Sequence, residues 1–308
     1  MPTCYTIKKY NKDIKNIHYN NMNEYYIESK NGKINILEGP DAINQKGIII
    51  NVHGLSCHFQ YIYDSLDEIT NKNKFFFKHR YKTFGFEFHG HGKSDGAKCT
   101  LYDFNDLIID LSVVINMIKT RYRNDKIFLL GESMGGAVVI KYIANKINNI
   151  NGIILLSPMC GIDNDMRPCC FLEKILLSCS YIFPLMTYGL NKNIAEESTC
   201  NKEYLNAYNN CPYTFNKLYP LVTLREIYNT SLKISNSYID CPCLIIHGEN
   251  DNITPLKQTI KFYYNVNNDN KKLLIIKDKG HNLLIPNDKD DSVPQYIYDN
   301  ILEWLDNI

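Results

Sequence analysis

The chain has 308 residues, of which 44% are hydrophobic and 22% are charged, as in an ordinary globular protein. Its 34 lysines and arginines nearly balance its 33 aspartates and glutamates, so the formal net charge is +1. This balance provides no basic stripe, and we expect no nucleic-acid partner. The 11 cysteines at irregular spacing and the polar N-terminus without a signal segment favour reduced thiols and a cytoplasmic location.

Apolar runs bounded by turn residues predict strands that alternate with helices along most of the chain. In order, we expect strand material in 5–38, a strand at 47–52, a helix at 60–70, a strand at 81–88, and a long helix from about 104 to 123 that Asp103 caps. There follow a strand at 126–130 with a helix after it, strands at 152–156, 243–247 and 273–276, a helix after Pro255 and a closing helix at 295–305. This alternation predicts an α/β protein with a mostly parallel sheet and right-handed crossovers.

Residues 159–235, here named the cap segment, interrupt this pattern. Glycine is sparse there, cysteine, tyrosine and leucine are frequent, and the sequence shows no buried strand. We therefore predict a helical cap inserted into a core formed by 1–158 and 236–308. Within the cap segment, 175–190 is apolar and uncharged. That stretch is either the buried side of the cap or an entrance for an acyl chain that also makes peripheral contact with a membrane.

The pentapeptide GESMG at 131–135 carries the strongest chemical signal. It matches G-x-S-x-G between a buried strand and a helix, a context in which a sharp turn lifts the serine hydroxyl above the sheet edge. Gly131 and Gly135 let the crowded backbone pass through that turn. We predict that Ser133 is a nucleophile.

A serine hydroxyl needs an adjacent base, and the base needs a third group to orient it. Asp251 and His281 each follow a predicted strand, in the chain order that this kind of site requires. The loops after parallel strands meet at one sheet edge, so we expect both side chains near Ser133. Glu249 and Asp278 are the nearby competing carboxylates.

Two backbone N–H groups should stabilise the negative charge that develops on the attacked carbonyl oxygen. Met134, directly after the nucleophile, should provide one donor, and Leu55, in the loop after the strand at 47–52, should provide the other. In the same loop, we expect Gly54 to help form the site and His53 to orient the loop.

Several motifs together resemble those of the monoacylglycerol lipase and lysophospholipase branch of the α/β-hydrolases. They are NVHG at 51–54, GHGKSDG at 90–96, GESMGG at 131–136, SPMC at 157–160, HGxxD at 247–251 and GH at 280–281. The resemblance implies an eight-stranded core, a helical cap and hydrolysis of esters with one acyl chain. It also assigns Ser133, Asp251 and His281 as catalytic residues. Glu132 stands where many monoglyceride lipases have histidine, and the cap segment matches least.

The expected function is that of a serine hydrolase that cleaves monoacylglycerol or lysophospholipid through an acyl-enzyme, without metal or cofactor. Three alternatives remain. A short-chain carboxylesterase or thioesterase would use the same residues, and a peptidase would need an acidic cluster that the sequence does not show. A non-catalytic binding protein is disfavoured because Ser133, Asp251 and His281 are all present.

Overall fold

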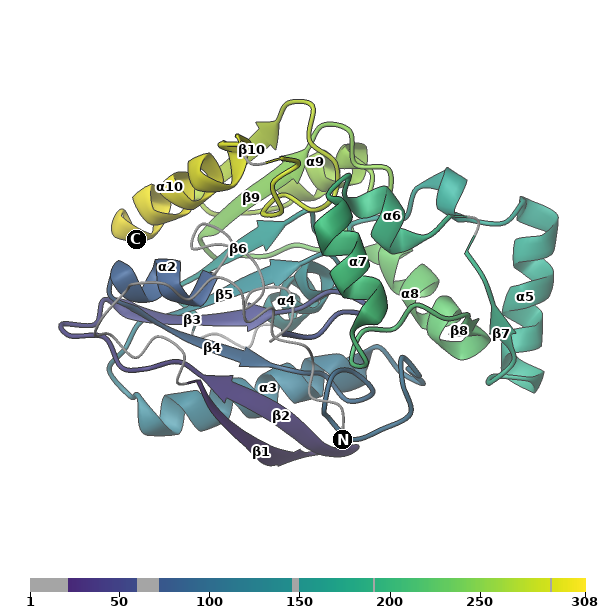
Figure 1. Ribbon diagram of the computed structural model, residues 1–308, viewed down its shortest axis with the longest axis horizontal. Coiled ribbons are helices and arrows are strands. Elements are labelled where there is room, and N and C mark those ends of the chain that lie inside the picture. Colours follow the sequence, from purple (N-terminus) through teal and green to yellow (C-terminus); the bar gives the residue numbers. More distant parts are fainter. Residues whose placement is uncertain (1–21, 60–71, 146–149, 191, 289) are drawn as a thin grey trace.

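Eight strands form one sheet through the centre of the molecule (Figure 1). The computed structural model describes residues 22–59, 72–145, 150–190, 192–288 and 290–308. The strands are β1 (Asn23–Ser29), β2 (Gly32–Glu38), β3 (Gly47–Val52), β4 (Tyr81–Phe86), β5 (Ile127–Glu132), β6 (Gly152–Leu156), β9 (Cys243–Gly248) and β10 (Lys271–Ile276). Their order is β1-β2-β4-β3-β5-β6-β9-β10, with only the pairs β1–β2 and β2–β4 antiparallel. The predicted mostly parallel, eight-stranded α/β fold is confirmed.

Helices cover both faces of the sheet, which explains why its central strands are apolar on both sides. The helices α3 (Asn105–Arg121), α4 (Met134–Ala144) and α9 (Leu256–Tyr264) contribute to the cluster that packs on one face. The helices α2 (Lys72–Lys78) and α10 (Val293–Asp306) pack on the other face. Adjacent residues of β3 point to opposite faces, because Ile48 and Ile50 belong to the first cluster and Ile49 to the second.

Between β6 and β9, the cap segment lies mostly beyond one end of the sheet, on the right in Figure 1. It contains η1 (Asn164–Met166), α5 (Cys170–Ile182), β7 (Thr187–Tyr188), α6 (Ile194–Ser198), α7 (Lys202–Asn210), β8 (Tyr219–Pro220) and α8 (Leu221–Ile234). Helix α8 packs on α4 of the core, and α5 packs on α8. Helix α5 is therefore joined to the core through another helix of the cap segment.

Some elements differ from the sequence-based expectations. The strand predicted at 81–88 ends at Phe86, and the helix predicted from 104 begins at Asn105, whose backbone N–H donates to Asp103 Oδ1 at 2.9 Å. The antiparallel pair β7–β8 was not expected. Residues 5–21 and the predicted helix at 60–70 lie outside the described residues.

Helix α2 was also missed, because its three consecutive phenylalanines do not show helical periodicity. Phe75 and Phe76 of this helix pack against the ring of Tyr298 in α10. Tertiary packing therefore accounts for a helix that local pattern does not predict.

The described residues lack two features that would change the functional interpretation. No helix among them is long and apolar enough to cross a membrane. In the same part of the chain, no three histidine, cysteine, aspartate or glutamate side chains are grouped so that they could hold a metal ion.

Candidate active site

Ser133 occupies the turn between β5 and α4 in an unusual backbone conformation. Its φ is 53° and its ψ is −119°, a region that side-chain-bearing residues seldom adopt and that costs on the order of 1–3 kcal/mol. The surrounding backbone holds it there. The N–H of Ser133 donates to Leu156 O at 3.1 Å, and its carbonyl accepts from Met159 N at 2.9 Å. The loop that follows β6 thus fixes the turn that carries the serine.

Glycines make room for this turn. A Cβ atom on Gly135 would lie 2.1 Å from Val52 O, and one on Gly131 would lie 2.8 Å from Gly135 O. Gly54, in the loop after β3, passes so close that an added Cβ would be 3.3 Å from Ser133 Cβ. The site-forming glycines predicted from the sequence therefore lie against the nucleophile turn.

Asp251 and His281 come together at the same sheet edge, after β9 and β10. His281 Nδ1 lies 2.8 Å from Asp251 Oδ2. The other carboxylate oxygen of Asp251 accepts the backbone N–H groups of Ile253 at 2.8 Å and Thr254 at 2.9 Å. Both carboxylate oxygens of Asp251 therefore have hydrogen-bond partners that fix their position, and this carboxylate in turn orients the imidazole of His281.

Burial by itself would raise the pKa of Asp251, but the neighbouring His281 and His247 lower it well below its ordinary value. Asp251 is therefore ionised across the neutral range. An ionised carboxylate at Nδ1 keeps the proton on that nitrogen and leaves Nε2 of His281 able to accept one.

Two residues to which the sequence analysis gave no role, Thr254 and the His247 of the HGxxD motif, complete this arrangement. The Thr254 hydroxyl donates to Asp251 Oδ2 at 2.8 Å and lies 3.2 Å from His281 Nδ1. His247 Nε2 lies 2.8 Å from Thr254 O and 3.2 Å from Asp251 Oδ2. The spacing Asp-x-x-Thr, which is typical of an aspartate that caps its own loop, was the available signal for Thr254.

The competing carboxylates have a different role. Glu249 Oε2 accepts the backbone N–H of Asp278 at 3.3 Å, and both residues are exposed. They tie together the loops after β9 and β10. The structure thus places Asp251, and neither competitor, against His281.

The loop after β3 is anchored by His53. Its Nδ1–H donates to Gly54 O at 2.8 Å, and its Nε2 accepts the backbone N–H of Phe88 at 3.1 Å. Burial lowers the pKa of His53 to about 4, so the ring is neutral as this pattern requires. His53 therefore links the loop that carries Leu55 to the chain after β4.

Leu55 and Met134 both border a cavity that Ser133 also lines. Met134 is the first residue of α4, and the first N–H groups of a helix have no acceptor within the helix. The helix dipole adds partial positive charge at that end. The two residues predicted as oxyanion donors therefore lie beside Ser133, and their role remains a prediction.

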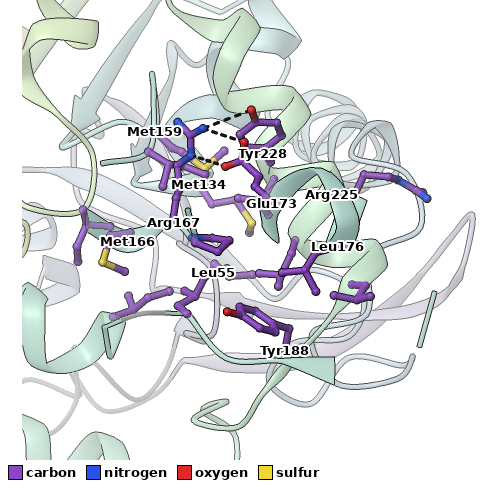
Figure 2. A pocket seen from close by; sticks show the side chains of 18 of the residues that line it. Leu55, Met134, Met159, Met166, Arg167, Glu173, Leu176, Tyr188, Arg225 and Tyr228 are labelled. Atoms are coloured by element: carbon purple, nitrogen blue, oxygen red, sulfur yellow. Dashed lines mark hydrogen bonds and ion pairs between the residues drawn. The ribbon is translucent and has the colours of Figure 1, made fainter. Parts of the chain in front are cut away.

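Two cavities border Ser133. The first, which we name the large cavity, is apolar and extends into the cap segment (Figure 2). It spans about 1000 Å³ of empty space when the open solvent at its mouth is included, and its lining is almost entirely apolar. Core residues such as Leu55 and Met134 form one wall, and Leu176, Tyr188 and Leu221 of the cap segment form another.

One wall of the large cavity contains paired charges. Arg167 Nε and Nη2 lie 2.7 and 3.0 Å from the two carboxylate oxygens of Glu173, and the guanidinium lies 5.0 Å from the centre of the Tyr228 ring. Figure 2 shows these three side chains directed toward one another. A second lining arginine, Arg225, pairs with Glu226 at 3.2 Å. Among the described lining residues the charges are therefore compensated.

A second cavity, which we name the small cavity, also borders Ser133. His281, Glu132 and Asn282 line it, and so do Tyr204 and Tyr208 of α7. Ser133, Leu55 and Ile194 border both cavities. Ser133 therefore stands at the junction of an apolar chamber and a more polar one, and His281 is on the polar side.

A family model described as "Serine aminopeptidase, S33" matches residues 43–290. The chain belongs to this family of α/β-hydrolases. It is 28% identical over 291 residues to "Putative esterase/lipase 2" of Mycoplasma genitalium, a match that covers 91% of this chain and 97% of the relative.

Monoglyceride lipases are also among the similar proteins. The rat (Rattus norvegicus) enzyme is 25% identical over 170 residues, which is 54% of this chain and 55% of that lipase. A crystal structure of a soluble variant of the Saccharomyces cerevisiae monoglyceride lipase, in complex with a substrate analogue, superimposes with a TM-score of 0.75. That match has 19% identity and covers 93% of this chain and 95% of the other, so it supports the fold.

Proposed function

We propose that this protein is a serine hydrolase that cleaves the carboxylic ester of a lipid with one acyl chain, through an acyl-enzyme. The observation that carries the proposal is the position of Ser133, which borders a large apolar cavity and shares the small cavity with the His281–Asp251 pair. Monoacylglycerol and lysophospholipid are the candidate substrates.

In the proposed mechanism, Ser133 Oγ attacks the ester carbonyl while His281 takes its proton. Asp251 keeps the imidazole oriented and stabilises its charged form. The N–H groups of Leu55 and Met134 stabilise the oxyanion. His281 then donates the proton to the departing alcohol, and in the second half it activates the water that releases the fatty acid.

The two cavities suggest where each half of the substrate binds. His281 must reach the oxygen of the departing alcohol, and it lines the small cavity. The alcohol is therefore assigned to the small cavity and the acyl chain to the large one, whose lining is apolar. A short-chain carboxylesterase or thioesterase would use the same catalytic residues, but an apolar lining that continues from Ser133 to Leu176 and Leu190 favours a long acyl group.

A peptidase is less well supported, although the family name includes aminopeptidase. An aminopeptidase binds the N-terminal residue of its substrate on the acyl side, where a free carboxylate would hold the amino group. Glu173 lines the large cavity but is paired with Arg167 through two contacts. Ester substrates therefore fit the large cavity better than peptides with a charged N-terminus.

We also propose that the cap segment makes peripheral contact with membranes. In the stretch 175–190, Leu176 and Leu177 line the large cavity, whereas Ile182, Phe183 and Leu185 are exposed. The exposed fraction of Ile182 is 72%. An exposed apolar patch next to an apolar cavity would let an acyl chain pass from a lipid surface without crossing water.

The test compares wild type with Ser133→Ala on three substrates: a long-chain monoacylglycerol, a long-chain lysophosphatidylcholine and a short acetate ester. We expect long-chain esters to have the highest kcat/KM and Ser133→Ala to lower kcat by about 10⁴-fold or more. A fluorophosphonate probe should label wild type and not the variant. If Ser133→Ala kept a tenth of the activity, the mechanism would be wrong. If only the acetate were cleaved, the protein would be a general esterase.

A further inference from the structure

One buried ion pair next to the nucleophile has no part in the mechanism above. Glu132 is the last residue of β5, directly before Ser133, and one of its carboxylate oxygens contacts the amine of Lys72. Lys72, the first residue of α2, has a side chain that is 0% exposed, while that of Glu132 is 27% exposed. The two partners therefore differ in their access to solvent.

A buried amine is costly unless an opposite charge lies next to it. Burial pushes the pKa of Lys72 well below its ordinary value, and nearby Cys57 works against that shift. The adjacent Glu132 carboxylate also favours the charged amine, because an opposite charge stabilises it. Lys72 thus holds the Glu132 carboxylate in one place at the end of β5.

The exposed part of Glu132 faces the small cavity, which Lys72 does not line. Among the described residues around that cavity, Glu132 is the one carboxylate, and none is a lysine or an arginine. Asn282, Ser198 and Tyr204 supply the neutral polar groups. A ligand in the small cavity would therefore meet hydrogen-bond acceptors, and the described residues that line it offer no lysine or arginine to bind a phosphate.

We propose that Glu132 is a specificity-determining residue that accepts hydrogen bonds from hydroxyl groups of the departing alcohol. It thereby selects single-acyl esters of neutral polyols, such as glycerol, over esters whose head group carries a phosphate. This inference rests on the proposed function, since it assumes that the small cavity receives the alcohol. Hydrogen bonds from hydroxyl groups to a carboxylate are stronger than neutral ones, whereas a phosphate would have no hydrogen to donate to Glu132 and would find no lysine or arginine among the described lining residues.

The test uses three oleoyl esters that differ only in the alcohol: monooleoylglycerol, methyl oleate and oleoyl-lysophosphatidate. For wild type, we expect kcat/KM for monooleoylglycerol to exceed that for lysophosphatidate by tenfold or more. In Glu132→Gln, the ratio of kcat/KM for monooleoylglycerol to that for methyl oleate should fall about tenfold, because the lost hydrogen bonds involve a charged acceptor. The ratio for lysophosphatidate to methyl oleate should rise.

Glu38→Gln is the matched control. Glu38 is likewise a carboxylate paired with a buried lysine, with Lys82 Nζ at 3.1 Å, but it is itself buried and lines neither cavity. Its substitution should leave all the ratios as in wild type. The double variant Lys72→Met with Glu132→Gln removes both charges together, so it tests the same ratios if the single variant is unstable.

The outcomes separate this inference from the proposed function. If wild type cleaves lysophosphatidate as well as it cleaves monooleoylglycerol, the inference is overturned while the proposed function stands. A Glu132→Gln variant that lowers kcat/KM for all three esters by one common factor also overturns it, because Glu132 would then only position Ser133. If wild type cleaves none of the three esters, the proposed function itself fails.

Discussion

Helices α4 and α5 differ in how firmly the fold holds them. In α4, which begins directly after Ser133, nine of the eleven residues are buried against the sheet. In α5, at the outer end of the cap segment, Ser180 is the one buried residue of thirteen. Under the proposed mechanism, the core therefore fixes the atoms that do the chemistry, while the cap segment supplies cavity walls that can vary. Catalytic power and substrate choice should therefore respond to different substitutions.

The largest expected effect is in the core. Asp251→Asn should lower kcat by about 10³–10⁴-fold, because a neutral amide neither fixes the tautomer of His281 nor stabilises its charged form. Steady-state kinetics on one monoacylglycerol would measure this. Glu249→Gln, an exposed carboxylate in the same loop, serves as the control and should keep wild-type activity. A loss below tenfold in Asp251→Asn would mean that Asp251 does not serve His281.

A smaller effect is expected in the cap segment. Replacing both Ile182 and Phe183 by glutamate should weaken binding to phosphatidylcholine vesicles by about tenfold or more, because exposed apolar side chains would no longer enter the lipid interface. Vesicle flotation measures binding, and kcat/KM on a short, water-soluble ester checks that the site is intact. The control is Tyr264→Glu, which charges an exposed position on α9 outside the cap segment. Unchanged flotation of the double variant would refute membrane contact.

The smallest expected effect concerns stability and returns to the core. Burial lowers the pKa of His53 to about 4 and that of His91 to about 3, and the two rings lie 5.2 Å apart. In the unfolded chain a histidine takes up its proton near pH 6.5. Between about pH 6.5 and 4 the unfolded state binds more protons, so the free energy of unfolding falls as the pH falls. The slope is about 1.4 kcal/mol per pH unit for each histidine.

Urea unfolding at several pH values in this window would measure that slope. His91→Asn should reduce the slope by about 1.4 kcal/mol per pH unit, the contribution of one proton. The activity of the folded enzyme is a separate readout and should not follow the same curve. An unchanged slope in His91→Asn would show that His91 is not buried in its neutral form.

Most of the sheet, and the placement of Ser133, Asp251 and His281 in loops at one sheet edge, could be predicted because each depends on a local pattern. Apolar runs located the strands from 47 onward to within a few residues, and loop position after a strand indicated Asp251 and His281. The oxyanion donors and the roles of all these residues remain predictions. Their geometry follows from the parallel sheet, which brings distant loops to one edge.

What was missed depends on contacts between distant segments. Helix α2 is stabilised by the packing of Phe75 and Phe76 against Tyr298. The proposed role of Lys72 depends on its contact with Glu132, which is distant in the sequence. No periodicity in residues 72–78 encodes either contact. The boundaries of the cap segment remain a prediction, although its chain path between β6 and β9 is visible in Figure 1.

The position of Ser133 between two cavities has a consequence for the order in which products leave. Under the proposed mechanism the alcohol departs first from the small cavity, and water enters the vacated space while the acyl chain still fills the large one. The fatty acid then leaves last, from the cavity that the next acyl chain must occupy. Product inhibition should accordingly be competitive for the acid. Added glycerol, entering where water does, should act as an acyl acceptor and return part of the acyl group to ester.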